Sequence, residues 1–413
     1  MNDARSPLVP AGRSPGHQRL VALDGLRGAA AAVVVLAHAL LVSTYADAYV
    51  ERLNGAETRS FLVRLLADTP LHHLVMSTEA VIIFFVLSGM VLTLPLLRGK
   101  SLDLWSYYPR RILRLWIPAA SAMLFAIAVI LVTGQDPADA TSQWTRTFSF
   151  PALTAKDILD SFLLITGSPK LNNPLWSLKW EMLFSLLLPI GVLLVVRLRR
   201  FLWAAVILCG VVSGIGTTIG SLAVKYLPMF LVGCIIARII VARGPVQRAS
   251  ANVAILLVGV LALGLPNTLR VVLPAPLPYP ASSLIQGAVL IGAAMIVYSL
   301  VGPSIAASLL SSAPFRFLGR ISFGVYLVHV PILLGGLHVV PDFPNRMLAL
   351  TIPLSFVVGW LFTRFVEEPS ASLARRAGRW AFRARARLSP PTPVAAPEHP
   401  GGPTVPVEDF SGT

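Results

Sequence analysis

The chain has 413 residues, of which 55% are hydrophobic and 13% charged, and its net charge is +15. Soluble domains carry roughly twice that share of charged residues, so the composition excludes an ordinary soluble protein and favours one polytopic membrane domain. The basic residues stand in short clusters between apolar blocks, which indicates topology signals rather than a nucleic-acid-binding surface. Cys209 and Cys234 both lie inside apolar blocks and indicate neither a disulfide framework nor a metal site.

Ten apolar stretches are long enough to cross a bilayer, which takes about 20 helical residues. We therefore predict an all-α, polytopic integral membrane protein with about ten transmembrane helices. The predicted spans cover residues 28–45, 79–97, 113–133, 174–196, 201–219, 222–241, 251–268, 282–301, 321–340 and 346–366.

The positions of the basic clusters support this count. If the spans alternate in direction, every cluster of arginine and lysine falls on one side of the membrane. The connections at 46–78 and 134–173 have nearly balanced charges and fall on the other side. Because positive loops stay in the cytoplasm, both termini are predicted to be cytoplasmic.

The sequence divides into three parts. Residues 1–20 form a polar, basic segment, residues 21–370 the ten-span domain, and residues 371–413 a cytoplasmic tail. The tail begins as a basic, amphipathic segment expected to lie on the inner leaflet. After Leu388 it is rich in proline and glycine, a composition that predicts disorder.

The first span carries a histidine at bilayer depth. His38 lies about ten residues, roughly 15 Å, from the cytoplasmic end of the span. On a helix it shares a face with Asp24 and Arg27, because steps of three and eleven residues return near the same angle. Intramembrane ionisable groups usually mark function, so His38 is a candidate catalytic residue; the alternative is a hydrogen bond to a neighbouring helix. Asp24 and Arg27 either support that site or pair and cap the helix.

Spans two and three contribute two further motifs. In FFVLSGMVL, Ser88 and Gly89 make a small polar notch that fits close helix packing or a direct role. In PRRILRLWIP, Arg110 and Arg114 share a helical face, with Arg111 beside them. Guanidinium groups bind phosphate bidentately, so this cluster suits a phosphorylated donor such as coenzyme A. Positive-inside anchoring explains the same arginines equally well.

Span four has a polar stripe on one face of an apolar helix. It begins NNPLWSLKWEMLFSLLLP, in which polar residues recur every four positions at Asn173, Ser177, Glu181 and Ser185. A lone carboxylate in a membrane either takes part in proton transfer or pairs with an arginine or histidine. Both roles are open for Glu181, while Trp176 has the simpler interpretation of an interfacial anchor.

Span nine, LGRISFGVYLVHVPIL, repeats the pattern. Ser322, Tyr326 and His329 recur at spacings of four and three and share one face. Helix packing and a direct role are both compatible with them. The acidic residues of the loops form no tight motif, so no metal site is expected.

Together these segments resemble the membrane acyltransferase-3 family, the integral-membrane O-acyltransferases of bacterial envelopes. Six stretches match in the order of the family, across about residues 20–370, and the family has a ten-span core. The matching stretches are LDGLRGAAAAVVVLAHA, FFVLSGMVL, RRILRLWIP, LWSLKWEMLFSLLLP, LGRISFGVYLVHVPIL and FVEEP.

The resemblance implies roles for individual residues. The membrane histidine of the family falls on His38, its Arg-x-x-x-Arg motif on Arg110 and Arg114, and its acidic residue on Glu181. The arginines would then hold acyl-coenzyme A. Where many members follow the acidic residue with polar and aromatic side chains, this chain continues from Met182 with leucine, phenylalanine and serine, which puts the acceptor preference in question.

The expected activity is the transfer of an acyl group, acetyl first, from acyl-coenzyme A to a hydroxyl of an envelope glycan or glycolipid. His38 would act as general base or carry the acyl group, and Glu181 would orient an imidazole or bind acceptor hydroxyls. The implied setting is the bacterial cytoplasmic membrane, with no bound cofactor and an extracytoplasmic partner enzyme for any second transfer. The alternatives are a secondary transporter and, less well matched, a membrane glycosyltransferase or polymerase.

Overall fold

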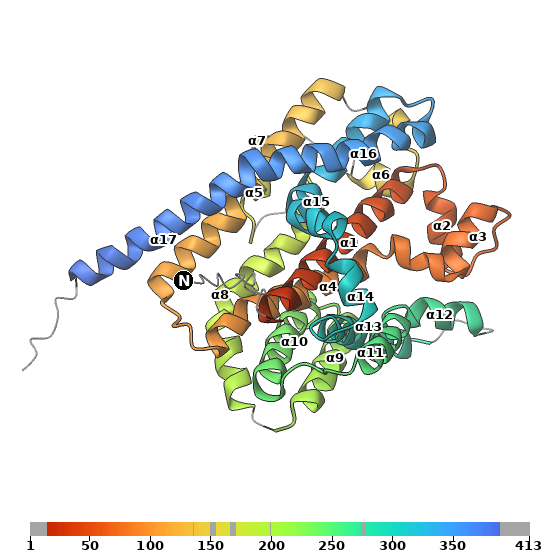
Figure 1. The fold of residues 1–413 in the computed structure, drawn as a ribbon. Coiled ribbons are helices and arrows are strands. Elements are labelled where there is room, and N and C mark those ends of the chain that lie inside the picture. Colours follow the sequence, from red (N-terminus) through yellow and green to blue (C-terminus); the bar gives the residue numbers. More distant parts are fainter. Residues whose placement is uncertain are drawn as a thin grey trace, which may run out of the picture.

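A computed structural model describes residues 15–134, 136–148, 154–165, 171–198, 200–273 and 278–388, and every regular element in them is helical (Figure 1). In chain order the elements are α1 (Pro15–Val42), α2 (Ala46–Leu53), α3 (Phe61–Asp68), η1 (Pro70–Val75), α4 (Ser77–Leu97), α5 (Leu104–Thr133), η2 (Pro137–Asp139), α6 (Gln143–Phe148), α7 (Ala155–Phe162), α8 (Leu175–Arg197), α9 (Leu202–Thr218), α10 (Leu222–Arg243), α11 (Ala249–Leu263), α12 (Leu265–Val272), α13 (Ala281–Ser299), α14 (Ile305–Leu310), α15 (Ala313–Val339), α16 (Pro344–Phe362), η3 (Thr363–Glu367) and α17 (Glu368–Leu388).

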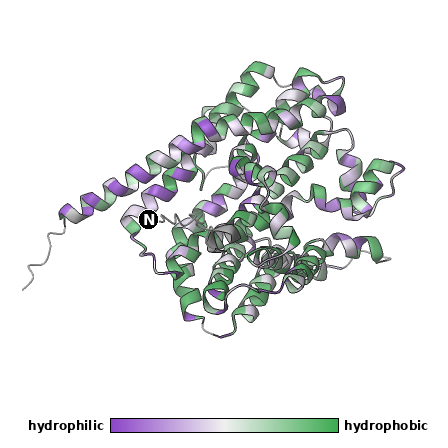
Figure 2. Ribbon diagram, viewed as in Figure 1, coloured by the Kyte–Doolittle hydropathy of each residue, from purple (hydrophilic) through white to green (hydrophobic). Residues whose placement is uncertain are grey.

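Among the described residues, eight helices are long and apolar enough to cross a membrane, and the bent pair of α11 and α12 makes a ninth candidate. α9 is a shorter apolar helix of 17 residues. Each predicted span coincides with one of these units, so the prediction of an all-α, polytopic membrane protein is confirmed. Figure 2 shows apolar residues along most of the ribbon and a concentration of hydrophilic residues along α17.

The predicted span at 251–268 is not one straight helix. α11 ends at Leu263, and α12 departs at an angle of 62°. Gly264 and Pro266 explain the break, because proline cannot donate in the ladder and restricts the residue before it. The ring of His73 packs against Gly264, where a Cβ would come within 2.7 Å of it, and His73 Nε2 lies 3.2 Å from the carbonyl oxygen of Val260.

The α1–α15 and α4–α10 pairs are among the helix pairs that pack backbone to backbone. A Cβ on Gly28 of α1 or Gly319 of α15 would overlap the facing helix, and the same holds for Gly89 of α4 against Phe230 and for Gly233 of α10 against α4. Small residues allow such close approach in membranes. The α1–α15 contact brings the polar faces of predicted spans one and nine together.

The C-terminal helix continues from the membrane domain without a break. The predicted boundary at residue 370 falls inside α17, which runs along α5 (Figure 1). Arg385 lies 3.2 Å from Asp103, and a side chain at Gly378 would meet Ser106 and Arg110. At least part of the predicted surface-lying tail therefore packs on another helix, and the predicted proline-rich disorder after Leu388 lies outside the described residues.

Candidate active site

Five helices, α1, α4, α5, α8 and α15, enclose a cavity of about 150 Å³ within the predicted membrane region. Its polar lining comes from each of the predicted motifs: Arg27, Ser88, Arg111, Arg114, Ser177, Glu181, Ser322 and Tyr326. The apolar lining is mostly from α4 and includes Val81, Phe84, Phe85, Leu87, Val91 and Leu92. Segments up to 299 residues apart in the chain thus meet around one space.

Glu181 is held by an ion pair inside this cavity. Its Oε1 lies 2.6 Å from Arg111 Nη2, and Ser88 Oγ donates to the same oxygen over 3.0 Å. Arg111 Nε donates to Ser185 Oγ over 2.8 Å, and Ser185 Oγ donates to the carbonyl oxygen of Glu181. This network joins α4, α5 and α8. Of the two roles left open for Glu181, the geometry displays the pairing with an arginine.

Arg27 and Arg114 are the two cations of the cavity that remain available. Neither makes a hydrogen bond or ion pair with another residue across the described part of the chain, although Glu367 lies within electrostatic reach of both. Two guanidinium groups without a direct partner offer the kind of donors that bind an anion such as phosphate. Arg110, the predicted partner of Arg114, does not line the cavity and is exposed near α17.

A hydrogen-bonded pair of hydroxyls closes one end of the cavity. Ser177 Oγ and Tyr326 Oη are 2.7 Å apart, and Tyr326 Oη donates to the carbonyl oxygen of Pro174 over 3.0 Å. The Tyr326 ring lies 5.9 Å, centre to centre, from the ring of His329. Tyr326 therefore contacts the cavity and the next buried polar group, His329.

His329 contacts His38, which does not line the cavity itself. His329 Nε2 lies 3.2 Å from His38 Nδ1, and both rings are buried. His38 Nδ1 is also 2.9 Å from the carbonyl oxygen of Val34, and His329 Nδ1 is 3.1 Å from that of Val325. A carbonyl oxygen only accepts, so each Nδ1 carries the hydrogen.

This assignment fixes the lone pairs of the two neutral rings. The single Nδ1–H of His38 is shared between the carbonyl oxygen of Val34 and His329 Nε2, and His38 Nε2 keeps its lone pair. The side chain of Asn173 lies near the His38 ring, and the Trp144 ring of α6 packs 5.4 Å from it, centre to centre. His38 Nε2 is therefore the nitrogen that can take a proton, which is the property required of a general base.

The remaining predicted site residues lie at the edges of this arrangement. Asp24 is exposed and does not line the cavity. Trp176 lies in an aromatic cluster with Phe85 and Tyr226, with ring centres 6.4 and 5.3 Å away, and not simply at an interface. Sequence reasoning missed Asn173 as a neighbour of His38, and Trp144 altogether. Among the described residues, no group of three or more metal-ligating side chains is placed to share an ion.

Comparison with known proteins gives one family and one curated relative. A family model described as an acyltransferase domain, that of the acyltransferase-3 family, matches residues 20–364. A Bacillus subtilis (strain 168) protein named "Putative peptidoglycan O-acetyltransferase YrhL" is 27% identical over 346 residues, which cover 70% of this chain and 49% of the relative. The chain thus spans about half the length of that relative. No solved structure matches.

Proposed function

Because the chain belongs to the acyltransferase-3 family and is therefore a multi-pass membrane acyltransferase, we propose that it moves an acyl group from acyl-coenzyme A to a hydroxyl of an envelope glycan. The observation that carries this proposal is the series of polar groups between helices: two unpaired arginines, then Tyr326, then the His329–His38 pair. Since the chain belongs to a family of enzymes, we do not assign it the alternative function of a secondary transporter.

The donor binds at the cavity. Arg27 and Arg114 hold phosphate groups of acyl-coenzyme A, and the apolar wall of α4, which includes Phe84 and Phe85, accommodates the uncharged arm. These arginines belong to the side that the basic clusters assign to the cytoplasm, where acyl-coenzyme A is found. The thioester then points toward Ser177 and Tyr326 at the closed end.

The chemistry takes place at His38. Its Nε2 removes the proton from the acceptor hydroxyl as the oxygen attacks the thioester carbonyl carbon. The new C–O bond forms, the C–S bond breaks, and the proton taken by Nε2 passes to the departing thiolate, which leaves as coenzyme A thiol. Together with the carbonyl oxygen of Val34, His329 holds His38 in the tautomer with a free Nε2 and supports the imidazolium that forms transiently.

The acceptor is proposed from chemistry and from the relative. A glycan built outside the cell reaches an acyl group only if the transfer crosses the membrane, and the polar series above runs in that direction. The name of the Bacillus relative makes acetyl transfer to peptidoglycan the first case to test. The corresponding location is the bacterial cytoplasmic membrane.

The test is acyl transfer in isolated membranes. Radiolabelled acetyl-coenzyme A is supplied to membranes that contain the wild type, His38→Ala or Arg110→Ala at matched expression, and label is followed into the glycan fraction. We expect transfer by the wild type and Arg110→Ala and a loss of at least about 100-fold in His38→Ala, the scale of general-base catalysis. Equal transfer by His38→Ala would remove the base from the proposal.

A further inference from the structure

A second, larger cavity lies on the side of the membrane opposite the basic clusters. It measures about 290 Å³, against about 150 Å³ for the inner cavity. It is formed where α2, η1, α4, α12 and α13 meet. The lining residues are Leu53, His72, Met76, Glu79, Pro266, Asn267, Leu269, Arg270, Leu273, Ser282, Ile285 and Gln286.

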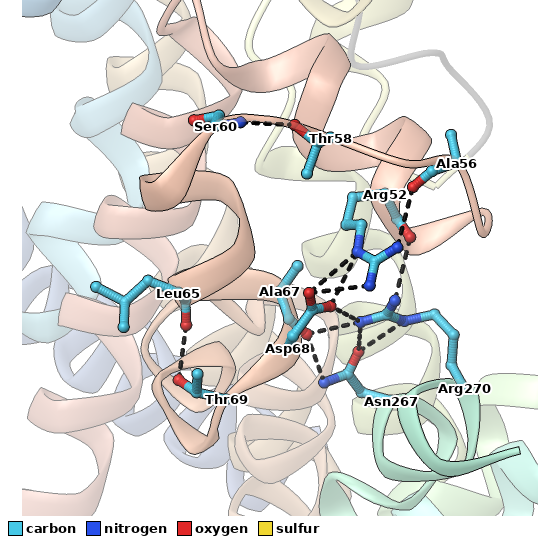
Figure 3. Close-up of polar contacts among 10 residues, drawn as sticks. All are labelled: Arg52, Ala56, Thr58, Ser60, Leu65, Ala67, Asp68, Thr69, Asn267 and Arg270. Carbon is cyan, nitrogen blue, oxygen red and sulfur yellow. Dashed lines mark hydrogen bonds and ion pairs between the residues drawn. The ribbon is translucent and has the colours of Figure 1, made fainter.

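A network of polar contacts links the elements of one wall of this outer cavity (Figure 3). All three nitrogens of the Arg270 side chain are engaged, donating to Asn267 Oδ1, to the carbonyl oxygens of Arg52 and Ala67, and to Asp68 Oδ1. Arg52 Nε in turn donates to both carboxylate oxygens of Asp68 over 3.1 Å. The network locks α2, α3 and α12 together. Because each of its nitrogens donates to the protein and Asp68 pairs with its charge, Arg270 is engaged in holding this wall together.

The opposite wall carries polar groups without partners. Glu79 of α4 and Gln286 of α13 make no hydrogen bond or ion pair with another residue of the described chain, and neither does the hydroxyl of Ser282. A carboxylate and a carboxamide at the membrane boundary need hydrogen-bond partners. Glu79 and Gln286 are half-buried and Ser282 is exposed, so all three can bond water or a ligand that enters the outer cavity.

The chemistry of the cavity selects a neutral, hydroxyl-rich ligand. Glu79 accepts hydrogen bonds from hydroxyls and repels anions, while Gln286 both donates and accepts. The positive charge of Lys225 acts on Glu79 and weakens its attraction for a cation. Met76, Leu269 and Ile285 offer apolar surface for the C–H face of a ring. A sugar residue combines these features.

We propose that the outer cavity binds a neutral sugar residue of the acceptor chain, away from the residue that is acylated. The identification of this sugar as part of the acyl acceptor rests on the proposed function. On α1, Leu40 packs against Tyr49 and Ala67 of the outer lobe, which consists of α2, α3, η1 and α12 and lies beside the outer cavity. His38 points about 200° away from Leu40 around the axis of α1 and faces α15. A helix about 10 Å across separates the two sites, so a single sugar cannot fill both and a chain of sugars can.

The direct test is donor-free binding by the purified full-length protein. The probes are the β-1,4-linked tetramer of N-acetylglucosamine, which is neutral, and the single sugar, titrated calorimetrically. We expect the wild type and Glu57→Ala, an exposed acid on the same side, to bind the tetramer equally. Glu79→Ala/Gln286→Ala should bind it at least tenfold more weakly. Equal binding by that variant, or no binding by the wild type, would overturn the inference.

Two additions keep the result interpretable. Thermal unfolding of each variant shows whether it folds. If the double variant does not fold, Glu79→Gln, which keeps the shape of the side chain and removes its charge, replaces it. In the transfer assay the double variant should raise the KM for long glycan and leave kcat unchanged. Tetramer binding without any transfer would refute the proposed function alone, whereas transfer with an unchanged KM for long glycan in the variants would refute the sugar site alone.

Discussion

His38 and His329 are separated by 291 positions in the chain and joined by one hydrogen bond in the structure. The periodicity of each helix sequence places its histidine on a polar face. It does not tell which face of which other helix packs against that polar face. The same limit applies to the arginines. Whether Arg110 or Arg111 reaches Glu181 depends on the rotation of α5 about its axis, which the packing of α8 and α17 sets.

The role of His329 as a positioning residue makes a prediction about pH. His329→Phe removes one of the two acceptors of His38 Nδ1–H and leaves the Val34 carbonyl oxygen, so we expect transfer to fall about 10- to 100-fold and the acidic limb of the pH–rate profile to move to lower pH. His329→Gln can place an oxygen where Nε2 lies and should recover part of the rate. If the phenylalanine variant lost rate with an unmoved profile and the glutamine variant gave no recovery, His329 would be a packing residue only.

The donor site predicts a difference between neighbouring arginines. Arg27→Ala and Arg114→Ala should each raise the KM for acyl-coenzyme A about tenfold, because a hydrogen bond to a charged group contributes about 1.5–3 kcal/mol. Arg110→Ala, which leaves the cavity lining intact, is the matched control and should behave as the wild type. Initial rates measured over a range of acyl-coenzyme A concentrations give the KM of each variant. An equal rise of KM in Arg110→Ala would contradict the assignment of the donor site to Arg27 and Arg114.

At the scale of the helix, sequence composition located every membrane unit and its approximate limits. It did not locate the bend at Gly264, because apolar residues continue on both sides of the break and the sequence there forms one hydrophobic block. The connection at 46–78 folds into α2, α3 and η1, whose stability comes from contacts with α12 some 200 residues later. Such contacts leave no local signature.

The α4–α10 contact should be intolerant of added volume. Gly89→Ala places a methyl group on the carbonyl oxygen of Phe230, which forces the helices apart and shifts the adjacent Ser88 in the cavity. We expect a loss of about 1–3 kcal/mol of stability together with lower transfer. Gly191→Ala on α8 is the control, because its nearest neighbours would be 3.7 Å from the new atom. Thermal unfolding of both variants in detergent provides the comparison, and an unchanged midpoint for Gly89→Ala would count against tight packing here.

The ion pair between Arg111 and Glu181 should act as a unit. Removing Glu181 alone leaves a guanidinium group in the membrane without its partner, at a cost on the order of 3 kcal/mol. The double variant Arg111→Gln/Glu181→Gln should be more stable than the sum of its single variants, with a coupling of about 1–3 kcal/mol. Additive effects in the unfolding midpoints would show that the two side chains do not depend on one another.

At the scale of the whole molecule, acid should destabilise the outer lobe formed by α2, α3, η1 and α12. Burial, with His73 and Arg270 nearby, lowers the pKa of His72 to about 4 from 6.5. Burial acts to raise the pKa of Asp68, but hydrogen bonds and charges of Arg52 and Arg270 outweigh it and hold that pKa below its usual 3.8. Both groups bind fewer protons when folded, so stability falls as the pH falls.

The pH windows of the two groups differ, which makes the prediction specific. The loss from His72 develops between pH 6.5 and about 4, where the unfolded chain is protonated and the folded chain is not. The contribution of Asp68 is complete above 3.8 and disappears as the pH drops through its lower folded value. The plot of unfolding midpoint against pH, measured from pH 7 to 3.5, should therefore be flatter than that of the wild type above pH 4 in His72→Gln. In Asp68→Asn it should be flatter below pH 4. A His72→Gln curve parallel to that of the wild type would contradict the first assignment.

The hydroxyl pair of Ser177 and Tyr326 has a consequence for the cell that contains this enzyme. A route through a protein from cytoplasm to exterior is a potential leak for the ion gradients on which a bacterium lives. Here two side chains from α8 and α15, held together and to Pro174 by hydrogen bonds, close the inner cavity toward the histidines. Under the proposed function, each acyl group must part these hydroxyls as it passes. The catalytic cycle is thereby also a cycle of opening and resealing the electrical insulation of the membrane.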